Sequence, residues 1–379
     1  MKILIVGNYR PSNNQSMMRF TDILVSGLED RGIHVEVVRP SPFLGRLFAA
    51  DSGVGKVAGA FDRFILFPCS LLFSKFDGDV LHIPDHGNAI YLMWFREVPV
   101  VVTCHDVQPY RSAREEIREN SLGMFSKIYQ HWVFSWIKRA EYLACVSETT
   151  RNEFLQLAGN TSTANTRVID PGLTYPYSPM LEEEARHRLR RLLGDDQSPF
   201  VIHVGSNVWY KNRLGVAKIF SGLIGYEAFR GMRLVTAGRR LTRDVRTWLV
   251  EQGHGERLKE LGPVEDEDLR ALYSKASFLL FPSFVEGFGM PIIEAQACGC
   301  LVVTSDRSPM RDVAGSGSIL IDPLHPLDAA RTINDQWKER DTMRAKGMAN
   351  AKRYSVDAMI SGYIELYNQA MGREPTRRK

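Results

Sequence analysis

Two glutamates, Glu286 and Glu294, flank a short stretch that contains two glycines and a proline. An apolar run at 278–281 precedes this stretch, and a second apolar run follows at 301–303. The order predicts a strand, a glycine loop, a short helix and another strand. The free N–H groups and the positive dipole end at the start of such a helix suit a phosphate. Carboxylates beside a phosphate are unfavourable unless they bind something else, such as sugar hydroxyls. The stretch therefore predicts a sugar-nucleotide site; the alternative is an ordinary strand-to-helix turn with surface glutamates.

The same stretch resembles the signature of the retaining glycosyltransferases of family four, which have the GT-B fold. The resemblance rests on the spacing of the two glutamates, on the glycines and proline between them, and on the alanine-rich helix that ends in Cys298-Gly299. It covers nearly the whole chain and is stronger in the second half. It implies an α/β chain with two Rossmann-like doubly wound domains that face each other across a cleft.

A lysine, Lys211, follows the predicted strand 200–205 within the loop that opens the second domain. A lysine at the carboxyl end of a strand suits a pyrophosphate, and the Lys-Asn pair of the family falls here. In relatives an arginine often precedes that lysine, but Ser206 and Asn207 occupy its place. The resemblance thus implies that this chain has one cation fewer at the pyrophosphate than many relatives. The alternative for Lys211 itself is an exposed, solvated lysine that binds no pyrophosphate.

A histidine, His105, directly follows the valine-rich predicted strand and Cys104 in the first domain. Enzymes with α/β folds place their chemistry at the carboxyl ends of strands, and a histidine can share a proton near neutral pH. His105 matches the acceptor-side histidine of the family. The alternative is a structural histidine whose hydrogen bonds are satisfied within the fold.

By resemblance, Glu286 holds hydroxyls of the transferred sugar, Glu294 holds the ribose, and the backbone near Val264 reads the nucleobase. The predicted catalytic residues are His105, Lys211 and Glu286. The predicted donor-binding residues are Gly205, Lys211, Asn212, Val264, Glu286, Gly287, Phe288, Gly289, Met290, Pro291 and Glu294.

The predicted reaction is the retaining transfer of a hexose, of the mannose or glucose type, from a GDP- or UDP-linked donor. The acceptor is a glycan or a lipid-linked molecule in the synthesis of surface polysaccharide or glycoconjugate. Lys211 and the helix start would stabilise the departing diphosphate, so no metal and no other cofactor is expected. The motif Asp77-Gly78-Asp79 precedes an apolar strand instead of following one, which favours a turn over a metal site. Two alternatives stay open: a sugar-nucleotide epimerase and a binding-only protein with a degenerate site.

The size and composition of the chain agree with two cytoplasmic domains. Its 379 residues predict about two domains, placed at 1–175 for the acceptor and 195–352 for the nucleotide sugar, with a closing helix at 353–371 that packs on the first. The odd number of cysteines without CxxC pairs argues against disulfides and zinc. A net charge of +4 allows anionic ligands or an acidic membrane surface, whereas no nucleic-acid partner is predicted.

Three further segments are ambiguous in the sequence. Gly53-Val54-Gly55-Lys56 lacks the flanking residues of a phosphate-binding loop and is predicted to be a mobile linker before a helix. The run 61–76 is apolar with few charges, and the stretch from Phe125 through Trp132 to Ala140 carries aromatic residues at helical spacing with basic neighbours. Both are either core-facing or a surface for peripheral contact with the inner face of the membrane.

Overall fold

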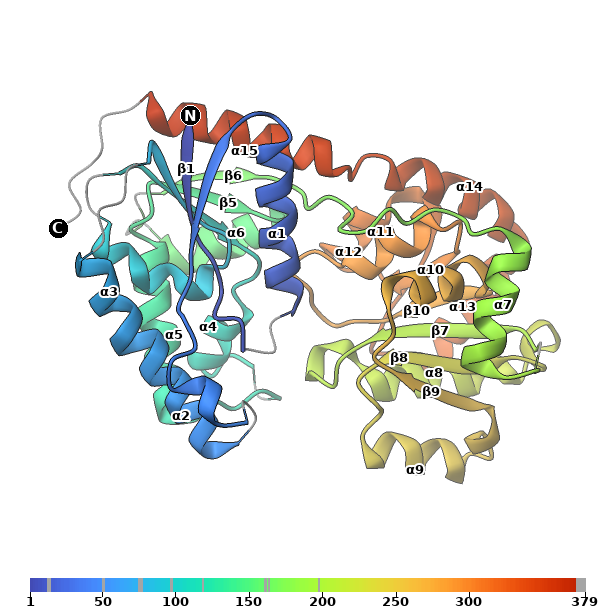
Figure 1. Cartoon of the computed structure of the whole chain (residues 1–379). Coiled ribbons are helices and arrows are strands. Elements are labelled where there is room, and N and C mark those ends of the chain that lie inside the picture. The colour runs from blue at the N-terminus through green and yellow to red at the C-terminus, as the bar shows by residue number, and fades with distance from the viewer. Residues whose placement is uncertain are drawn as a thin grey trace. The chain divides into compact units, whose positions relative to one another are not determined.

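The computed structural model describes residues 1–11, 15–49, 52–73, 78–95, 98–117, 119–159, 162, 164–196 and 198–372. The chain forms two units (Figure 1). The first comprises Met1–Thr174 and the segment from Val356 onward, and the second comprises Tyr175–Ser355. The second unit thus begins well before the predicted position 195. The helix that precedes this position belongs to it, because Arg191 binds Asp268 of the second unit at 2.7 Å.

The first unit is built on a parallel sheet of six strands in the order β2-β1-β3-β4-β5-β6. Successive residues of a strand point to opposite faces. Ile3 and Ile5 of the first strand therefore pack in a different core from Leu4 and Val6. The strands are β1 (Lys2–Val6), β2 (His34–Val38), β3 (Val80–Ile83), β4 (Val100–Cys104), β5 (Tyr142–Cys145) and β6 (Asn165–Val168).

Helices cover both faces of this sheet. The helices α1 and α15 pack on one face, and α3, α5 and α6 pack on the other (Figure 1). Ser147 caps the helix that follows it, because its hydroxyl accepts the N–H of Thr150 at 3.1 Å. The helices are α1 (Gln15–Glu29), α2 (Gly53–Phe61), α3 (Phe67–Phe73), α4 (Gln108–Ala113), α5 (Met124–Ile137), α6 (Glu148–Ala158) and α15 (Val356–Met371), with the turns η1 (Gly45–Leu47), η2 (Asp62–Leu66) and η3 (His86–Trp94).

The second unit repeats this plan with the strand order β12-β11-β10-β7-β8-β9, and its strand pairs are all parallel. The order reverses between β7 and β10, and ligands of such sheets bind at this switch point, beyond the carboxyl ends of the strands. The prediction of two Rossmann-like doubly wound domains is confirmed. The strands are β7 (Phe200–Gly205), β8 (Arg233–Gly238), β9 (Leu258–Gly262), β10 (Phe278–Phe281), β11 (Val302–Ser305) and β12 (Ser318–Ile321).

Eight α-helices accompany the described strands of the second unit. They are α7 (Glu182–Leu193), α8 (Arg213–Ile224), α9 (Arg243–Glu251), α10 (Asp266–Lys275), α11 (Met290–Ala297), α12 (Met310–Ala314), α13 (Pro326–Gln336) and α14 (Arg340–Ala351). The short turns are η5 (Trp209–Lys211), η6 (Glu227–Phe229), η7 (Gly255–Arg257), η8 (Gly315–Gly317) and η9 (Trp337–Glu339).

The predicted linker at Gly53–Lys56 is wrong, because these residues form the first turn of α2. The hydroxyl of Ser52 accepts the N–H of Gly55 at 2.9 Å and caps the helix. In the motif Asp77-Gly78-Asp79, the first aspartate lies outside the described residues. The carboxylate of Asp79 accepts the backbone N–H of Lys2 at 2.7 Å, so it ties the turn to β1.

Candidate functional site

Lys211 and Glu286 meet at the switch point of the second sheet. Lys211 lies in the turn η5 after β7, and Glu286 lies in the loop after β10, the strand paired with β7. The Lys211 ammonium donates to Oε1 of Glu286 at 2.7 Å, and the two side chains are only 13% and 11% exposed. The ammonium also lies 4.6 Å from the centre of the Phe281 ring. The sequence predicted both residues at this site but did not predict their ion pair.

The loop after Glu286 leads into the helix α11 through Gly289. This glycine has φ 107° and ψ 49°, a left-handed conformation in which a side chain would be strained. A Cβ atom built there would also lie 3.0 Å from Cδ1 of Ile292. Pro291 is the second residue of α11, where its missing N–H removes no intrahelical bond. The prediction that the N–H groups of this first turn bind a phosphate concerns this helix start.

Glu294 lies one turn further along α11, on the side of α10. Its carboxylate accepts a hydrogen bond from the Tyr273 hydroxyl at 3.1 Å. Burial raises the pKa of this phenol well above its usual value, and the carboxylate raises it further. Tyr273 therefore remains a hydrogen-bond donor at any physiological pH, and it fixes the orientation of Glu294.

Asn212 is a structural member of the site. Its side chain caps α8 by accepting the N–H of Gly215 at 3.1 Å, and it donates to the carbonyl of Pro282 at 3.0 Å. It thereby ties the end of β7 to the end of β10 and helps to hold Lys211 in place. Among the other predicted residues, Phe288 is buried and lies edge-on to Tyr354, with 5.4 Å between ring centres. Val264 lies half-buried in the loop between β9 and α10.

The sequence reasoning missed Arg213, a buried cation beside Lys211. Its guanidinium donates to the side chain of Asn207 at 2.6 Å and to the carbonyls of Gly205 and Arg239. No carboxylate of the described residues lies within ion-pair distance of it, and burial lowers the pKa of the guanidinium. A buried arginine at the first position of a helix is unusual, because the positive charge meets the positive end of the helix dipole. An anion bound nearby would relieve both effects.

His105 belongs to the first unit and follows β4, as predicted. Its Nε2 lies 2.8 Å from the carbonyl of Pro84, which can only accept, so this nitrogen carries the proton. Burial lowers the pKa of the ring below its usual value, although the nearby Asp85 works against this. The neutral ring therefore presents Nδ1 as an acceptor, which suits a hydroxyl group.

Asp85 and His86, which the sequence reasoning also missed, surround this histidine. The Asp85 carboxylate is buried and accepts hydrogen bonds from Asn8 at 2.5 Å and from the N–H of Gly87 at 2.9 Å. Burial works to raise the pKa of this carboxyl, but His86 and His105 bring it below its usual range. Asn8 follows β1 and Asp85 follows β3, so the pair marks the switch point of the first sheet.

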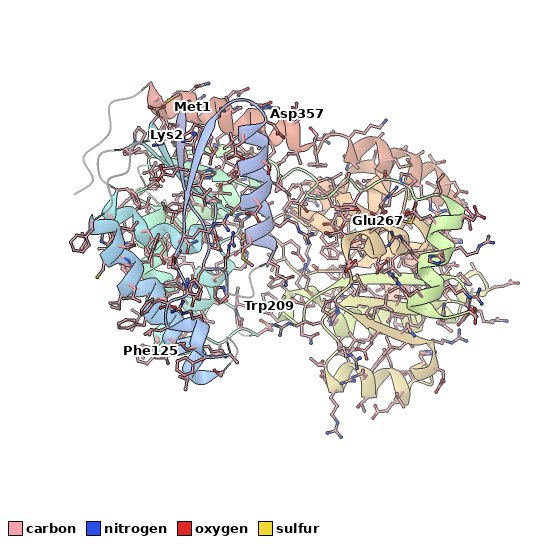
Figure 2. All side chains as sticks on the ribbon, in the orientation of Figure 1. Met1, Lys2, Phe125, Trp209, Glu267 and Asp357 are labelled. Carbon is pink, nitrogen blue, oxygen red and sulfur yellow. The ribbon has the colours of Figure 1, made fainter. Side chains whose placement is uncertain are left out.

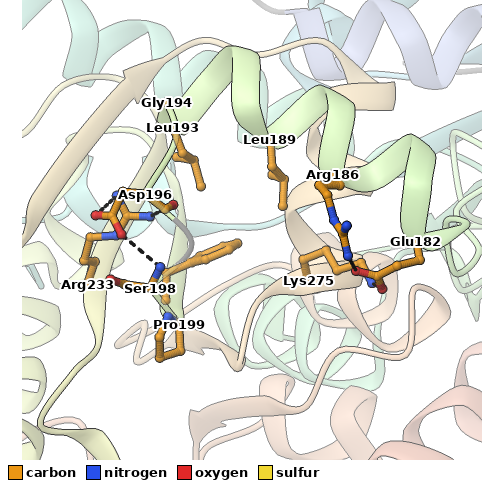
Figure 3. A pocket seen from close by; sticks show the side chains of 11 residues that line it. Glu182, Arg186, Leu189, Leu193, Gly194, Asp196, Ser198, Pro199, Arg233 and Lys275 are labelled. Atoms are coloured by element: carbon orange, nitrogen blue, oxygen red, sulfur yellow. Dashed lines mark hydrogen bonds and ion pairs between the residues drawn. The ribbon is translucent and has the colours of Figure 1, made fainter.

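A separate cavity of about 180 Å³ in the second unit lies away from this chemistry. It is lined by α7 and by the start of β7 at Phe200, the end of the sheet opposite to Lys211. Figure 3 shows its charges in pairs: Arg186 with Glu182 at 3.4 Å, and Arg233 with Asp196 at 2.8 Å. Paired charges at the amino end of a strand make a poor site for a nucleotide.

Neither metal-binding clusters nor membrane-spanning helices are found in the part of the chain that the structure describes. No three described His, Cys, Asp or Glu side chains converge so that they could hold a metal ion. None of the described helices has the combined length and apolar character needed to cross a bilayer.

Known proteins resemble both halves of the chain. The model of glycosyl transferases group 1 matches residues 186–354, and that of Glycosyltransferase Family 4 matches residues 18–174. The O-antigen chain mannosyltransferase B of Escherichia coli is 28% identical over 293 residues, which cover 74% of this chain and 73% of the relative. Sucrose-phosphate synthase of Thermosynechococcus elongatus has a TM-score of 0.74 at 17% identity, covering 98% of this chain and 99% of the other. Anabaena HepE in complex with UDP-glucose has a TM-score of 0.70 at 18% identity, covering 97% and 100%.

The two family models together extend over most of both units, and the solved structures share the arrangement of two parallel doubly wound sheets. The chain therefore belongs to the group 1 glycosyltransferases of family four, enzymes with the GT-B fold.

Proposed function

We propose that this enzyme transfers a hexose of the mannose or glucose type from a UDP- or GDP-linked donor with retention of configuration. The observation that carries this proposal is the Lys211–Glu286 pair at the switch point of the second sheet, beside the start of α11. A diphosphate placed there meets both a cation and the free N–H groups of a helix. The mannosyltransferase relative and the UDP-glucose complex of HepE support the class of donor.

In the proposed reaction, the bond between the sugar C1 and the β-phosphate oxygen breaks while the acceptor oxygen bonds C1 from the same face. The acceptor proton passes to the departing phosphate, so no protein nucleophile is needed. Lys211 and the first turn of α11 stabilise the negative charge that develops on the diphosphate. Glu286 binds hydroxyls of the sugar, and Glu294 binds the ribose, held in place by Tyr273.

His105 supplies the hydrogen-bond acceptor for a hydroxyl of the sugar or of the acceptor. Its protonated Nε2 is already bound to Pro84, which leaves Nδ1 for this task. The acceptor is a glycan or a lipid-linked molecule of surface polysaccharide or glycoconjugate synthesis. All five cysteines are free thiols, which supports a reducing compartment, the cytoplasm, as the place of reaction.

The test combines donor binding with transfer. Purified protein is screened by thermal shift against UDP-, GDP- and ADP-sugars, and the best donor is then used in a transfer assay with excess EDTA. We expect one nucleotide class to raise the melting temperature, and we expect transfer to persist in EDTA because Lys211 and α11 stabilise the leaving group. Restoration of a lost activity by manganese or magnesium would show that a metal stabilises the leaving group instead.

The same assays on variants separate the three functions left open by the sequence. The variants are Glu286→Gln and Glu286→Ala, and Glu251→Gln on the exposed surface of α9 is the matched control. A transferase loses turnover in the Glu286 variants and keeps it in the control. An epimerase would release free nucleoside diphosphate or a changed sugar nucleotide without any acceptor. A binding-only protein would show the thermal shift but no product, and either of these two results would overturn the proposal.

A further inference from the structure

Large apolar side chains that face solvent gather in one part of the first unit. The exposed phenylalanines and tryptophans of the described residues all lie between positions 43 and 132. In the second unit the exposed large hydrophobic residues are aliphatic and scattered, with Val250 and Leu327 as examples. The exposed aromatic residues are Phe43, Phe48, Phe61, Phe73, Phe125 and Trp132.

The helix α2 exposes its large apolar residues and buries its small ones, the opposite of an ordinary surface helix. Its small residues, Gly55, Ala58 and Gly59, are buried, and Gly59 packs against the ring of Tyr9. Its large residues point outward: Val57 is 71% exposed, and Val54 and Phe61 are exposed on the same side. A soluble surface helix normally buries its large residues and exposes polar ones. This helix therefore has an apolar stripe that faces solvent among the described residues.

The helix α5 extends this surface. It exposes Met124, Phe125, Ile128 and Trp132, which recur at helical spacing. The rings of Phe64 in η2 and Tyr129 in α5 are 5.7 Å apart, so the two segments lie side by side. Figure 1 shows α2, α3 and α5 together, and Figure 2 shows Phe125 at the border of the unit. The membrane face, as we call this surface, consists of the exposed residues Val54, Val57, Phe61, Ile65, Leu72, Phe73, Met124, Phe125, Ile128 and Trp132.

A cavity of about 250 Å³ with a basic lining borders this face. Lys56 and Arg63 line it together with Tyr9 and the glycines of η1 and α2. The neighbouring acid, Asp62, is completely buried, and its carboxylate accepts the Tyr9 hydroxyl at 2.9 Å and the N–H of Gly45 at 2.8 Å. No described carboxylate forms an ion pair with Lys56 or Arg63, and Nε of Arg63 is buried without a hydrogen-bond partner. The Arg63 side chain also hydrogen-bonds the hydroxyls of Tyr91 and Tyr129, which hold it at the cavity without neutralising it. The cavity thus has two cations in its lining that no described carboxylate neutralises.

We propose that the membrane face docks on a bilayer that contains anionic phospholipid, with a head-group phosphate in the cavity between Lys56 and Arg63. Aromatic and aliphatic side chains beside basic residues are the composition of an interfacial membrane surface. A symmetric dimer through the same face is disfavoured, because it would bring the basic cavities of two copies toward one another. The docking goes beyond the proposed transfer reaction and is measured without donor or acceptor, so the two proposals fail independently.

The experiment is co-sedimentation of the full chain with phosphatidylcholine vesicles, with and without phosphatidylglycerol. We expect binding to the anionic vesicles that weakens as salt rises. Phe73→Asp and Phe125→Asp should each lower the affinity about tenfold or more, since each removes a buried aromatic ring from the lipid. Lys56→Gln should lower it about fivefold, the effect of one basic residue near an anionic surface.

The matched controls make the same kinds of change on the second unit. Val250→Asp and Leu327→Asp are the controls for the two phenylalanine variants, and Lys352→Gln is the control for Lys56→Gln. Because all these positions are exposed, the melting temperature of each variant should equal that of the wild type. Controls that weaken binding as much as the face variants would overturn the proposal. Failure of the wild type to bind either kind of vesicle would also overturn the proposal. In that case, dimerisation that depends on Phe73 would show that the face binds a second copy, and binding of inorganic phosphate that depends on Lys56 would show that the cavity is an anion site only.

Discussion

The ion pair between Lys211 and Glu286 changes how each residue meets a donor. The two residues neutralise each other at 2.7 Å, so the site is not simply a cationic clamp. An ammonium has three N–H groups and can keep Glu286 while it donates to a phosphate oxygen. A carboxylate with one oxygen bound to lysine still has its second oxygen for a sugar hydroxyl. In the proposed reaction, the pair would thus fix the distance between the phosphate and sugar contacts before the donor arrives.

We expect His105→Ala to lower turnover by roughly 10²–10⁴-fold while donor affinity and melting temperature stay nearly unchanged.

The pH dependence of turnover gives a second prediction for His105. Protonation of its ring would abolish the hydrogen-bond acceptor at Nδ1. Because burial holds the pKa of the ring below 6.5, turnover of the wild type should stay level from pH 8 to that value and fall only at lower pH. Binding constants, melting temperatures and pH–rate profiles on one preparation check this. A proportional loss of stability and of all activities would assign His105 a structural role.

For Arg213→Met we expect lower stability and weaker donor binding. Removal of the guanidinium breaks its hydrogen bonds to the side chain of Asn207 and to the carbonyls of Gly205 and Arg239, which should cost about 1–3 kcal/mol in total. The missing charge should also raise the dissociation constant for the nucleoside diphosphate more than that for the nucleoside. Thermal denaturation and calorimetric titration measure the two effects.

The double variant Arg213→Met/Ser206→Arg distinguishes the charge from the hydrogen bonds. It restores a cation close after β7, where relatives often have an arginine, and should recover diphosphate affinity without recovering stability. If diphosphate affinity is unaffected by either variant, Arg213 acts only through packing.

The candidate donor residues could be named from the sequence because they are local in it. Glu286, Glu294 and the glycines belong to one continuous stretch, and Lys211 follows a recognisable apolar strand. Arg213 and Asp85 could not be recognised in the same way, because their importance comes from burial and from partners far away in the chain. A cation at the start of a helix, two residues after Lys211, was the only available signal for Arg213.

At the scale of elements, α15 is tied to the first sheet by a chain of buried polar groups. The ring of His82 lies 2.6 Å from the Tyr367 hydroxyl and 2.8 Å from the Thr103 hydroxyl, which in turn lies 2.8 Å from the Tyr363 hydroxyl. Each of these four side chains hydrogen-bonds another of them, so the helix has one register on the sheet in which all four keep a partner.

We expect Gly27→Ala to destabilise the contact between α1 and α15. A Cβ atom at position 27 would lie 2.6 Å from Cγ1 of Ile360, which forces the helices apart. Overpacking of this kind costs about 1–3 kcal/mol, more than the helix propensity that alanine adds. Urea unfolding measures the change; Ser26→Ala on the exposed side is the control. The double variant Gly27→Ala/Ile360→Val should recover part of the loss, and a stabilised single variant would contradict the packing argument.

Elements buried on both faces were predictable from sequence, and some of those at sheet edges were not. The central strands β1, β4, β7 and β10 are continuous apolar runs. The edge strands β6 and β9 are not, because Asn165–Val168 and Leu258–Gly262 contain polar and charged residues. The helix α2 was missed for a different reason: its glycines disfavour a helix locally, and only the close packing against Tyr9 compensates for them.

For the whole molecule we expect acid to destabilise both units. His82 and His203, one in each unit, are completely buried, and burial lowers the pKa of each ring to about 3. The unfolded chain binds these protons near pH 6.5 and the folded chain does not. The free energy of unfolding should therefore fall by about 1.4 kcal/mol per histidine for each pH unit below 6.5, until about pH 3.

Urea unfolding near pH 7.5 and near pH 5 measures this slope. His82→Gln should reduce the slope, whereas His34→Gln, on an exposed histidine, should leave it unchanged. Stability that is independent of pH in this range would show that the two rings are not kept neutral.

The division of the chain also determines the order in which its parts mature on the ribosome. The second unit is one continuous segment, Tyr175–Ser355, and all of its strands are synthesised before α15. The first unit precedes it in synthesis, yet the face of its sheet that α1 covers in part is completed only when Ile360, Tyr363 and Tyr367 emerge. A chain that ends before Val356 should therefore contain all strands of the second unit. Its first unit should still expose core residues, to which chaperones can bind.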